Sequence, residues 1–220
     1  MTVSLALADF VPVILFAITG VLLMRDLYNK LSKGAFALIS AGIIMVLVAG
    51  IYKASWKLVY ALGTADLYLL NDAFLPIQAA GFLLLGLGLV AGSFFPQGNT
   101  QGSTTLHSIF PWMSFFFLTA AVPEKERGAM IFIIFMVLGY LGFCGCLTRT
   151  AARMKKPAAV ILYVLSFVLL MGMGYLGSRE FGNDPKMNWI EEGCNTFAQL
   201  CLLFATLTLH RSGLGQRESL

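Results

Sequence analysis

The chain has 220 residues, of which 58% are hydrophobic and only 12% are charged. Soluble domains are about 45–50% apolar and about 25% charged, and a soluble fold of this length could not cover so much apolar surface. The composition excludes an ordinary soluble protein. It predicts an all-α, polytopic membrane helix bundle that occupies residues 1–220 as a single transmembrane domain.

Seven apolar segments, separated by charged residues or by a turn-rich stretch at 96–105, are candidates to cross a bilayer. A spanning helix takes roughly 20 mostly apolar residues. The predicted helices cover residues 3–25, 34–60, 73–95, 106–122, 128–148, 157–178 and 187–210. Residues 1–8 contain no basic residue and no cleavage site follows, so we expect the first helix to be retained.

Basic residues are distributed unevenly over the connections between these helices. With the N-terminus outside, the inner connections hold nine of the 15 basic residues, but only Asp26 and Glu218 as acids. Because basic residues stay on the cytoplasmic side, an N-out, C-in, multi-pass protein of the cell membrane is predicted. The net charge of +4 then needs no nucleic-acid partner. Asp26 is expected to pair with its neighbour Arg25 at a helix end.

The two halves of the chain share a weak pattern. A basic connection joins helices one and two, and another joins helices five and six. Asn71-Asp72 precedes Gly81 as Asn183-Asp184 precedes Gly193, with nine residues from each aspartate to its glycine. This pattern suggests two parallel three-helix units joined by a fourth helix, a 3+1+3 plan found in some transporters.

That layout resembles the plan of the SWEET sugar transporters and KDEL receptors. The resemblance covers the order and orientation of the helices only. The Pro-Gln pair of that superfamily is not at matching places, because Pro96-Gln97 lies in a predicted loop and 128–148 contains no proline.

The last predicted helix carries a polar stripe. At 100° per residue, six polar side chains fall within a sector of roughly 100°, and Glu191 lies to one side of it. A stripe of this kind cannot face lipid without cost, so it should face the bundle interior. It is typical either of a hydrated pocket or of hydrogen bonds between helices. The six residues are Glu192, Asn195, Thr196, Gln199, Thr206 and His210.

Ionisable residues also gather in the predicted outer half. Opposite charges at similar depth should pair, because an unpaired charge in a membrane is costly. We expect Lys53 to pair with Glu192, and Lys57 to extend toward lipid headgroups. The candidate ligand-binding residues are Glu192, Asn195, Gln199, Thr196, Lys53, Glu191 and Asp9.

No motif specifies a metal, a cofactor or covalent catalysis. His107 and His210 do not form a metal-binding set, and the C-x-C of Cys144 and Cys146 is too short to specify one. A G-x-S-x-G elbow and a P-loop are both absent. We therefore expect neither a metal nor a cofactor.

Glycines recur along three predicted helices at spacings that favour close helix packing. We expect them to form packing surfaces, through which the chain could also form a homo-oligomer. They are Gly81, Gly88 and Gly92, then Gly139, Gly142 and Gly145, and finally Gly172, Gly174 and Gly177.

These features favour a small membrane protein that binds a polar or amphipathic ligand in an outer-facing intramembrane cavity, for transport or sensing. Membrane lipids are the other expected partners. One alternative is an intramembrane enzyme for a lipid or isoprenoid substrate, with Glu192 or Asp9 as the acid/base. Another is a non-catalytic scaffold held by its glycine faces. Convergent carboxylates would favour the enzyme, and the absence of a cavity would favour the scaffold.

Overall fold

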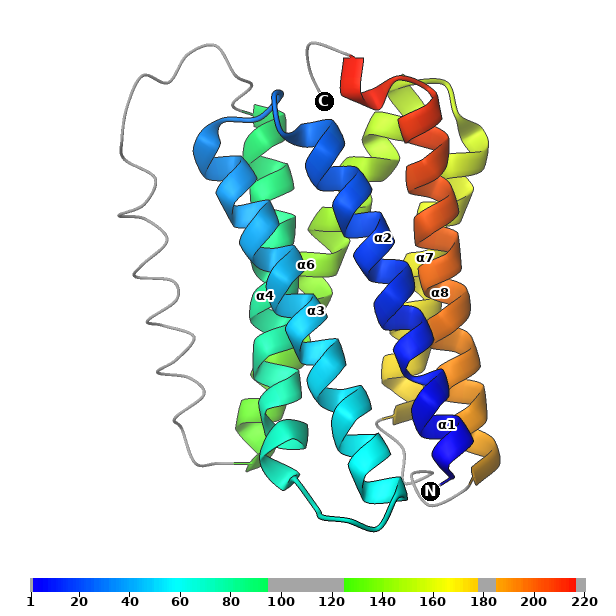
Figure 1. The fold of residues 1–220 in the computed structure, drawn as a ribbon. Coiled ribbons are helices and arrows are strands. Elements are labelled where there is room, and N and C mark those ends of the chain that lie inside the picture. Colours follow the sequence, from blue (N-terminus) through cyan, green and yellow to red (C-terminus); the bar gives the residue numbers. More distant parts are fainter. Residues whose placement is uncertain (1, 95–124, 178–184, 217–220) are drawn as a thin grey trace.

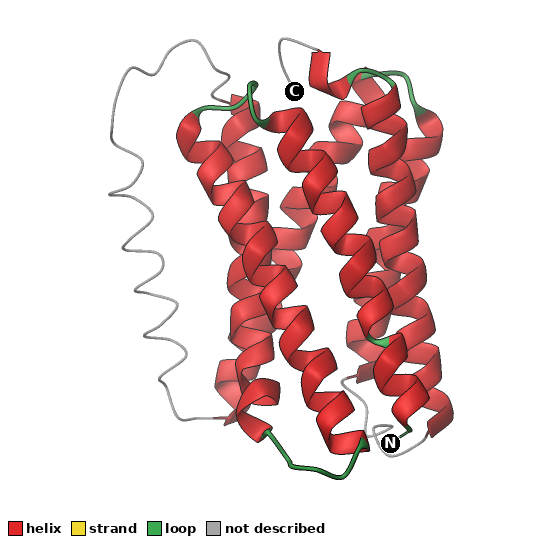
Figure 2. Cartoon of the chain, viewed as in Figure 1, coloured by secondary structure: helices red, strands yellow, loops and turns green. Residues whose placement is uncertain are grey.

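A computed structural model describes residues 2–94, 125–177 and 185–216, and within these ranges all regular structure is helical (Figure 2). The helix expected over 106–122 lies outside the described residues. The elements are α1 (Val3–Ala8), α2 (Phe10–Leu27), α3 (Lys33–Ala61), α4 (Tyr68–Phe94), α6 (Lys125–Arg153), α7 (Pro157–Gly177), α8 (Pro185–Arg211) and the short 3₁₀ helix η2 (Leu214–Gln216).

The long helices form a closed ring (Figure 1). Contacts between neighbours follow the chain order α2, α3, α4, α6, α7 and α8, and the ring closes where α2 contacts α8. Helices α2, α4, α6 and α8 run toward one end of the bundle, whereas α3 and α7 run toward the other. Helix α4 ends at the end opposite to the one where α6 begins, as a further crossing between them would require. The 3+1+3 repeat stays a prediction, since its joining helix is not described.

Proline and aspartate interrupt the first span. A single helix was expected over 3–25, but the structure has α1 and α2, with a break at Asp9. Pro12 has no N–H and so cannot bond to the carbonyl of Ala8, which weakens the helix just there. Together the two segments still form one apolar span, Val3–Leu27.

The connection between α3 and α4 is shorter than expected. Helix α4 begins at Tyr68 rather than at residue 73, because Asp72, which ends the charge-free run, lies inside the helix. Outside the hydrocarbon a charge does not have to end a helix. The indole Nε1 of Trp56 donates to Asp66 Oδ1 at 2.9 Å and ties the connection back onto α3.

Glycines set the closest helix contacts, as the sequence predicted for α4 and part of α6. A Cβ atom added at Gly139 would collide with the backbone of Phe82, and one at Gly88 would come within 3.0 Å of the carbonyl of Ala35. At Gly145 and Gly172 an added Cβ would meet no described atom within 4 Å, so for these two glycines the packing surface stays a prediction. The whole α4 set and two of the three α6 glycines therefore contact neighbouring segments in the described structure.

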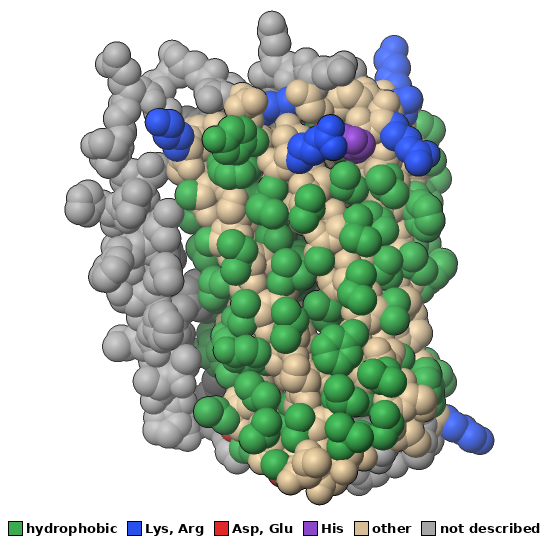
Figure 3. Space-filling view, in the orientation of Figure 1, with side chains coloured by type: hydrophobic (Ala, Val, Ile, Leu, Met, Phe, Trp, Pro, Cys, Tyr) green, Lys and Arg blue, Asp and Glu red, His purple; other side chains and the backbone are tan. Residues whose placement is uncertain are grey.

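Apolar side chains cover the flank of the bundle, while Lys and Arg gather at one end (Figure 3). Four spans are long and apolar enough to cross a membrane, namely Val3–Leu27, Lys33–Ala61, Tyr68–Ser93 and Met130–Arg153. Helix α7 adds a shorter apolar stretch, Pro157–Met173. The described part of the chain is thus all-helical, with the long apolar helices of a membrane protein. We call the ends the basic end, where α2 and α8 finish, and the N-terminal end, where α1 begins.

Candidate functional site

A pocket opens between the helices in the half of the bundle that contains the N-terminal end. The space that the centre of a water molecule can reach there is about 70 Å³, several times the roughly 10–15 Å³ that one water requires. Side chains from α2, α3, α4, α7 and α8 line it, together with Asp9. The polar lining residues are Asp9, Lys53, Gln78, Glu192, Asn195 and Gln199.

Local helix geometry brings these side chains together. The break before Pro12 places Asp9 at the pocket wall, where it is 6% exposed. On α8, Glu192, Asn195 and Gln199 are spaced three and four residues apart, so they share one face. Asp9, Glu192, Asn195 and Gln199, all predicted as candidate ligand-binding residues, therefore line the pocket.

A single lysine ammonium joins two carboxylates from opposite ends of the chain. Lys57 Nζ lies 2.5 Å from Asp9 Oδ2 and 3.9 Å from Glu192 Oε2. The side chains are largely buried, with exposures of 17% for Lys57 and 5% for Asp9. This three-residue cluster links α3, α8 and the α1–α2 break, and two of its members, Asp9 and Glu192, line the pocket.

Lys53, expected to make that contact, points elsewhere. Its Nζ lies 4.6 Å from the centre of the Phe74 ring on α4, a cation–π arrangement. It lines the same pocket, but no described carboxylate oxygen lies within 4.0 Å of it. The expected Lys53–Glu192 pair is thus wrong, and so is the expectation that Lys57 extends to headgroups. Residues four apart share a helix face, so the position of each lysine along α3 relative to α8 decides which of the two reaches Glu192.

Three buried acceptor atoms in the pocket wall lack hydrogen bonds among the described residues. Asp9 Oδ2 lies against Lys57 Nζ, whereas Glu192 Oε1 and Gln199 Oε1 have no partner among the described residues. Glu192 is 7% exposed and Gln199 6%. An unsatisfied buried acceptor costs roughly 1–3 kcal/mol, so these atoms require a donor from water or from a bound molecule.

The polar stripe of α8 divides into two parts. The N-terminal part lines the pocket through Glu192, Asn195 and Gln199, whereas Thr206 bonds instead to Tyr163 OH at 3.1 Å and to the carbonyl of Leu202. Both interpretations of the stripe are therefore represented along one helix. Phe197 and Phe204 face outward, with exposures of 52% and 55%, as the periodicity predicts. Glu191 and Thr196 are half-buried and do not line the pocket.

Behind the pocket lies a buried hydroxyl network that the sequence reasoning missed. Tyr140 OH and Ser166 Oγ lie 2.7 Å apart, and Ser166 donates to the carbonyl of Ala198 at 2.8 Å. The ring of Tyr140 also packs edge-on against Phe82, which lines the pocket. The available signal was a tyrosine and a serine inside otherwise apolar runs, and it is weak because such residues also occur at helix ends.

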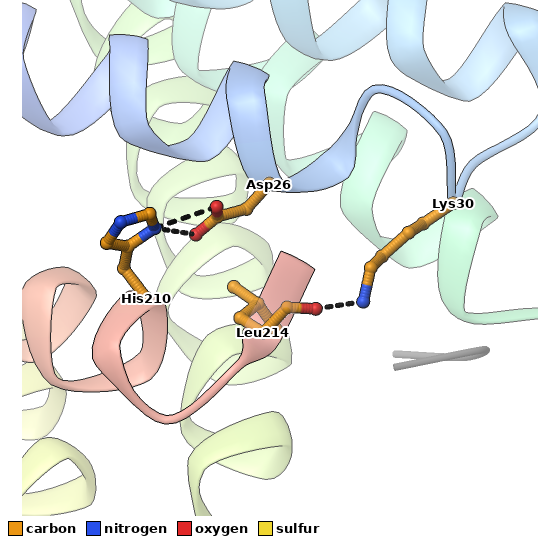
Figure 4. A network of polar contacts seen from close by, with 4 residues as sticks. All are labelled: Asp26, Lys30, His210 and Leu214. Carbon is orange, nitrogen blue, oxygen red and sulfur yellow. Dashed lines mark hydrogen bonds and ion pairs between the residues drawn. The ribbon is translucent and has the colours of Figure 1, made fainter. Parts of the chain in front are cut away.

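A second polar cluster lies at the basic end (Figure 4). Asp26 accepts from His210 Nδ1 through both carboxylate oxygens, at 2.8 and 3.0 Å, and is 5% exposed. Lys30 donates to the carbonyl of Leu214 in η2. The expected pair with Arg25 is therefore wrong. Adjacent residues on a helix point about 100° apart, so the α8 residue is better placed than a neighbour in the chain.

The described residues contain no group of three or more His, Cys, Asp or Glu side chains that could hold a metal ion. The four cysteines are free thiols in the interior or at helix interfaces. Comparison with protein-family models, with curated proteins and with solved structures finds no match. The function proposed below therefore rests on the geometry of the pocket alone.

Proposed function

We propose that this is a multi-pass protein of the cell membrane, with seven spans, the N-terminus outside and the C-terminus inside. It binds a polar or amphipathic small molecule in a pocket that opens toward the outside, for transport or sensing. The observation that carries this proposal is the pocket itself. Polar and charged side chains from helices far apart in the sequence converge there on a water-sized space inside an apolar bundle.

The orientation rests on the ends of the described helices. The segments that finish α2 and α6, and those that start α3 and α7, bring basic side chains to the basic end. Because such residues stay in the cytoplasm, the pocket in the other half faces outward. The charges around the pocket also argue against a purely structural scaffold, since a buried charge that only holds helices together gives little net stability.

Packed apolar side chains lie between this pocket and a second pocket of about 230 Å³ at the basic end, which is lined by Arg25, Asp26, His210, Gly213 and Gly215. Tyr140, Phe143, Leu27 and Leu209 are fully buried there, and the Asp26–His210 pair lies beyond them. A transporter in this state would have no continuous path between the two pockets, as alternating access requires. A sensor would use the packed side chains between them to relay occupancy to the cytoplasm.

Native mass spectrometry of the purified full-length protein tests the proposal. The wild type should retain a small-molecule adduct that the double variant Lys53→Met, Glu192→Gln loses. The matched control is Phe197→Leu, which changes an outward-facing residue on the same helix. An adduct of equal occupancy in all three proteins would place the ligand elsewhere and contradict the proposal.

One observation favours a second candidate, an intramembrane enzyme for a lipid or isoprenoid substrate. Asp9 and Glu192 converge on Lys57 at the pocket edge, and two carboxylates in different surroundings can act as acid and base. Incubating the protein in nanodiscs with a mixed lipid and isoprenoid extract would test this. A product that Glu192→Gln abolishes supports the enzyme, and unchanged lipids exclude it for that mixture.

A further inference from the structure

Among the charged residues that line the pocket, Lys53 and Glu192 have no described opposite charge within hydrogen-bond distance. Lys57 Nζ lies 2.5 Å from Asp9 but 3.9 Å from Glu192, so its nearer carboxylate is Asp9. Glu192 shares Lys57 with Asp9, whose carboxyl group also lies beside it, and Lys53 contacts the ring of Phe74 rather than an acid. A ligand that satisfies both residues must carry a positive and a negative group.

The hydrogen bonds narrow the kind of positive group. Glu192 Oε1 is a buried acceptor in the pocket wall with no partner among the described residues, and so is Gln199 Oε1. A carboxylate can only accept, so the group that lies against it must donate. A primary ammonium has three N–H donors, whereas a trimethylammonium has none and would leave both oxygens unsatisfied.

The remaining wall is apolar and extends deeper into the bundle. Phe16, Phe82, Leu170 and Met173 line it, from α2, α4 and α7. A charged head between Lys53 and Glu192 could thus continue into an apolar chain along these residues. A pocket with both charged and apolar walls suits an amphiphile. A small hydrophilic molecule would leave the apolar wall without contacts.

We infer that the pocket recognises a zwitterionic amphiphile whose head carries a primary ammonium next to a phosphate, as in an ethanolamine phosphodiester. The ammonium lies against Glu192 and Gln199, and the phosphate lies against Lys53. This inference rests on the proposed function and specifies the ligand of that same pocket.

Competitive binding to the purified full-length protein, measured by native mass spectrometry, tests the inference. The probes are a single-chain ethanolamine phospholipid, its choline counterpart with the same chain, and free phosphoethanolamine. The wild type should prefer the ethanolamine lipid to the choline lipid by about tenfold or more, because hydrogen bonds to a charged group contribute roughly 1.5–3 kcal/mol. Free phosphoethanolamine should bind more weakly than the lipid. If it binds as tightly, the apolar wall does not contribute and the amphiphile is excluded.

Two variants assign the two charges. Glu192→Gln should remove the preference between the two lipids, whereas the neighbouring Glu191→Gln, outside the pocket wall, should keep it. Lys53→Met should weaken both lipids alike, since both contain the phosphate. The Glu192→Gln pattern is a ratio of two lipids bound to the same protein, so a general loss of stability does not imitate it.

The outcomes separate this inference from the proposed function. If the wild type binds both lipids equally and Lys53→Met weakens both, the pocket binds ligand but does not select an ammonium, and only the inference falls. If Glu192→Gln keeps the tenfold preference, the assignment of the ammonium is wrong. If no variant changes the binding of any probe, the pocket is not the site and both proposals fall.

Discussion

Lys57 is the residue on which the polar edge of the pocket depends most. It is the ion-pair partner of both Asp9 and Glu192. Lys57→Met should therefore lower the free energy of unfolding by about 3 kcal/mol or more, because it leaves two buried carboxylates without their cation. Thermal unfolding in detergent micelles measures the loss.

A double-mutant cycle tests whether that cost comes from the ion pair. Asp9→Asn combined with Lys57→Met should be more stable than Lys57→Met alone, since the closest stranded charge is gone. Strictly additive losses would show that the two residues are not coupled.

At the basic end, His210 has the same role toward Asp26. Replacing His210 with leucine strands a carboxylate that is 5% exposed, and we expect a loss of about 2 kcal/mol in the free energy of unfolding. Arg211→Leu is the matched control, because that side chain is exposed and next in the chain. Equal melting temperatures for the two variants would show that the contact in Figure 4 does not stabilise the fold.

At this scale the sequence supplied the charged residues but not their partners. The stripe on α8 follows from periodicity alone, so Asn195 and Gln199 in the pocket wall could be predicted. Partner choice depends on how each helix is rotated about its axis, which a single sequence does not determine. This is why Lys53 was paired with Glu192 in place of Lys57, and Asp26 with Arg25 in place of His210.

Among the elements, α4 and α6 make the contact most sensitive to added volume. A Cβ at Gly139 would collide with the backbone of Phe82, and backbone atoms cannot move aside as a side chain can. Gly139→Ala should cost about 1–3 kcal/mol through overpacking. Thermal unfolding of the purified variants measures it.

Gly145→Ala provides the control on the same helix. An added Cβ there meets no described atom within 4 Å, and alanine favours a helix over glycine by up to about 1 kcal/mol. This variant should be as stable as the wild type or slightly more so. A loss as large as that of Gly139→Ala would show that the effect has another origin.

Helix boundaries were predicted well where a proline or a basic connection marks them, as at Pro157, where α7 begins. They were predicted poorly where helices extend beyond the apolar run, as at Tyr68 and Lys125, the first residues of α4 and α6. A search for apolar runs finds the part of a helix that crosses the hydrocarbon rather than the whole helix. The break at Asp9 was also missed, although Pro12 provides the physical cause.

For the whole molecule, the orientation makes a direct prediction. In a cysteine-free background, Lys155→Cys between α6 and α7 should react with a membrane-impermeant maleimide only after the cells are permeabilised. Thr64→Cys, between α3 and α4 at the opposite end, should react in intact cells. The reverse pattern would invert the topology and place the pocket on the cytoplasmic side.

The membrane class follows from composition alone, because no soluble fold could bury so much apolar surface. The closed ring and the pocket inside it could not be predicted, since they depend on which helices are neighbours. Composition says little about that, as nearly every helix here offers apolar residues on several faces.

The most direct test of the account is the accessibility of Gln199 to water. In a cysteine-free background, Gln199→Cys should react in intact cells with a small charged methanethiosulfonate reagent applied from outside. Phe197→Cys, two residues away and facing outward from the bundle, should not react. The reagent requires a thiolate, and a thiol that faces lipid stays protonated. Reaction at Gln199→Cys alone is the predicted result. No reaction there, or faster reaction at Phe197→Cys, would contradict an outward-facing aqueous pocket.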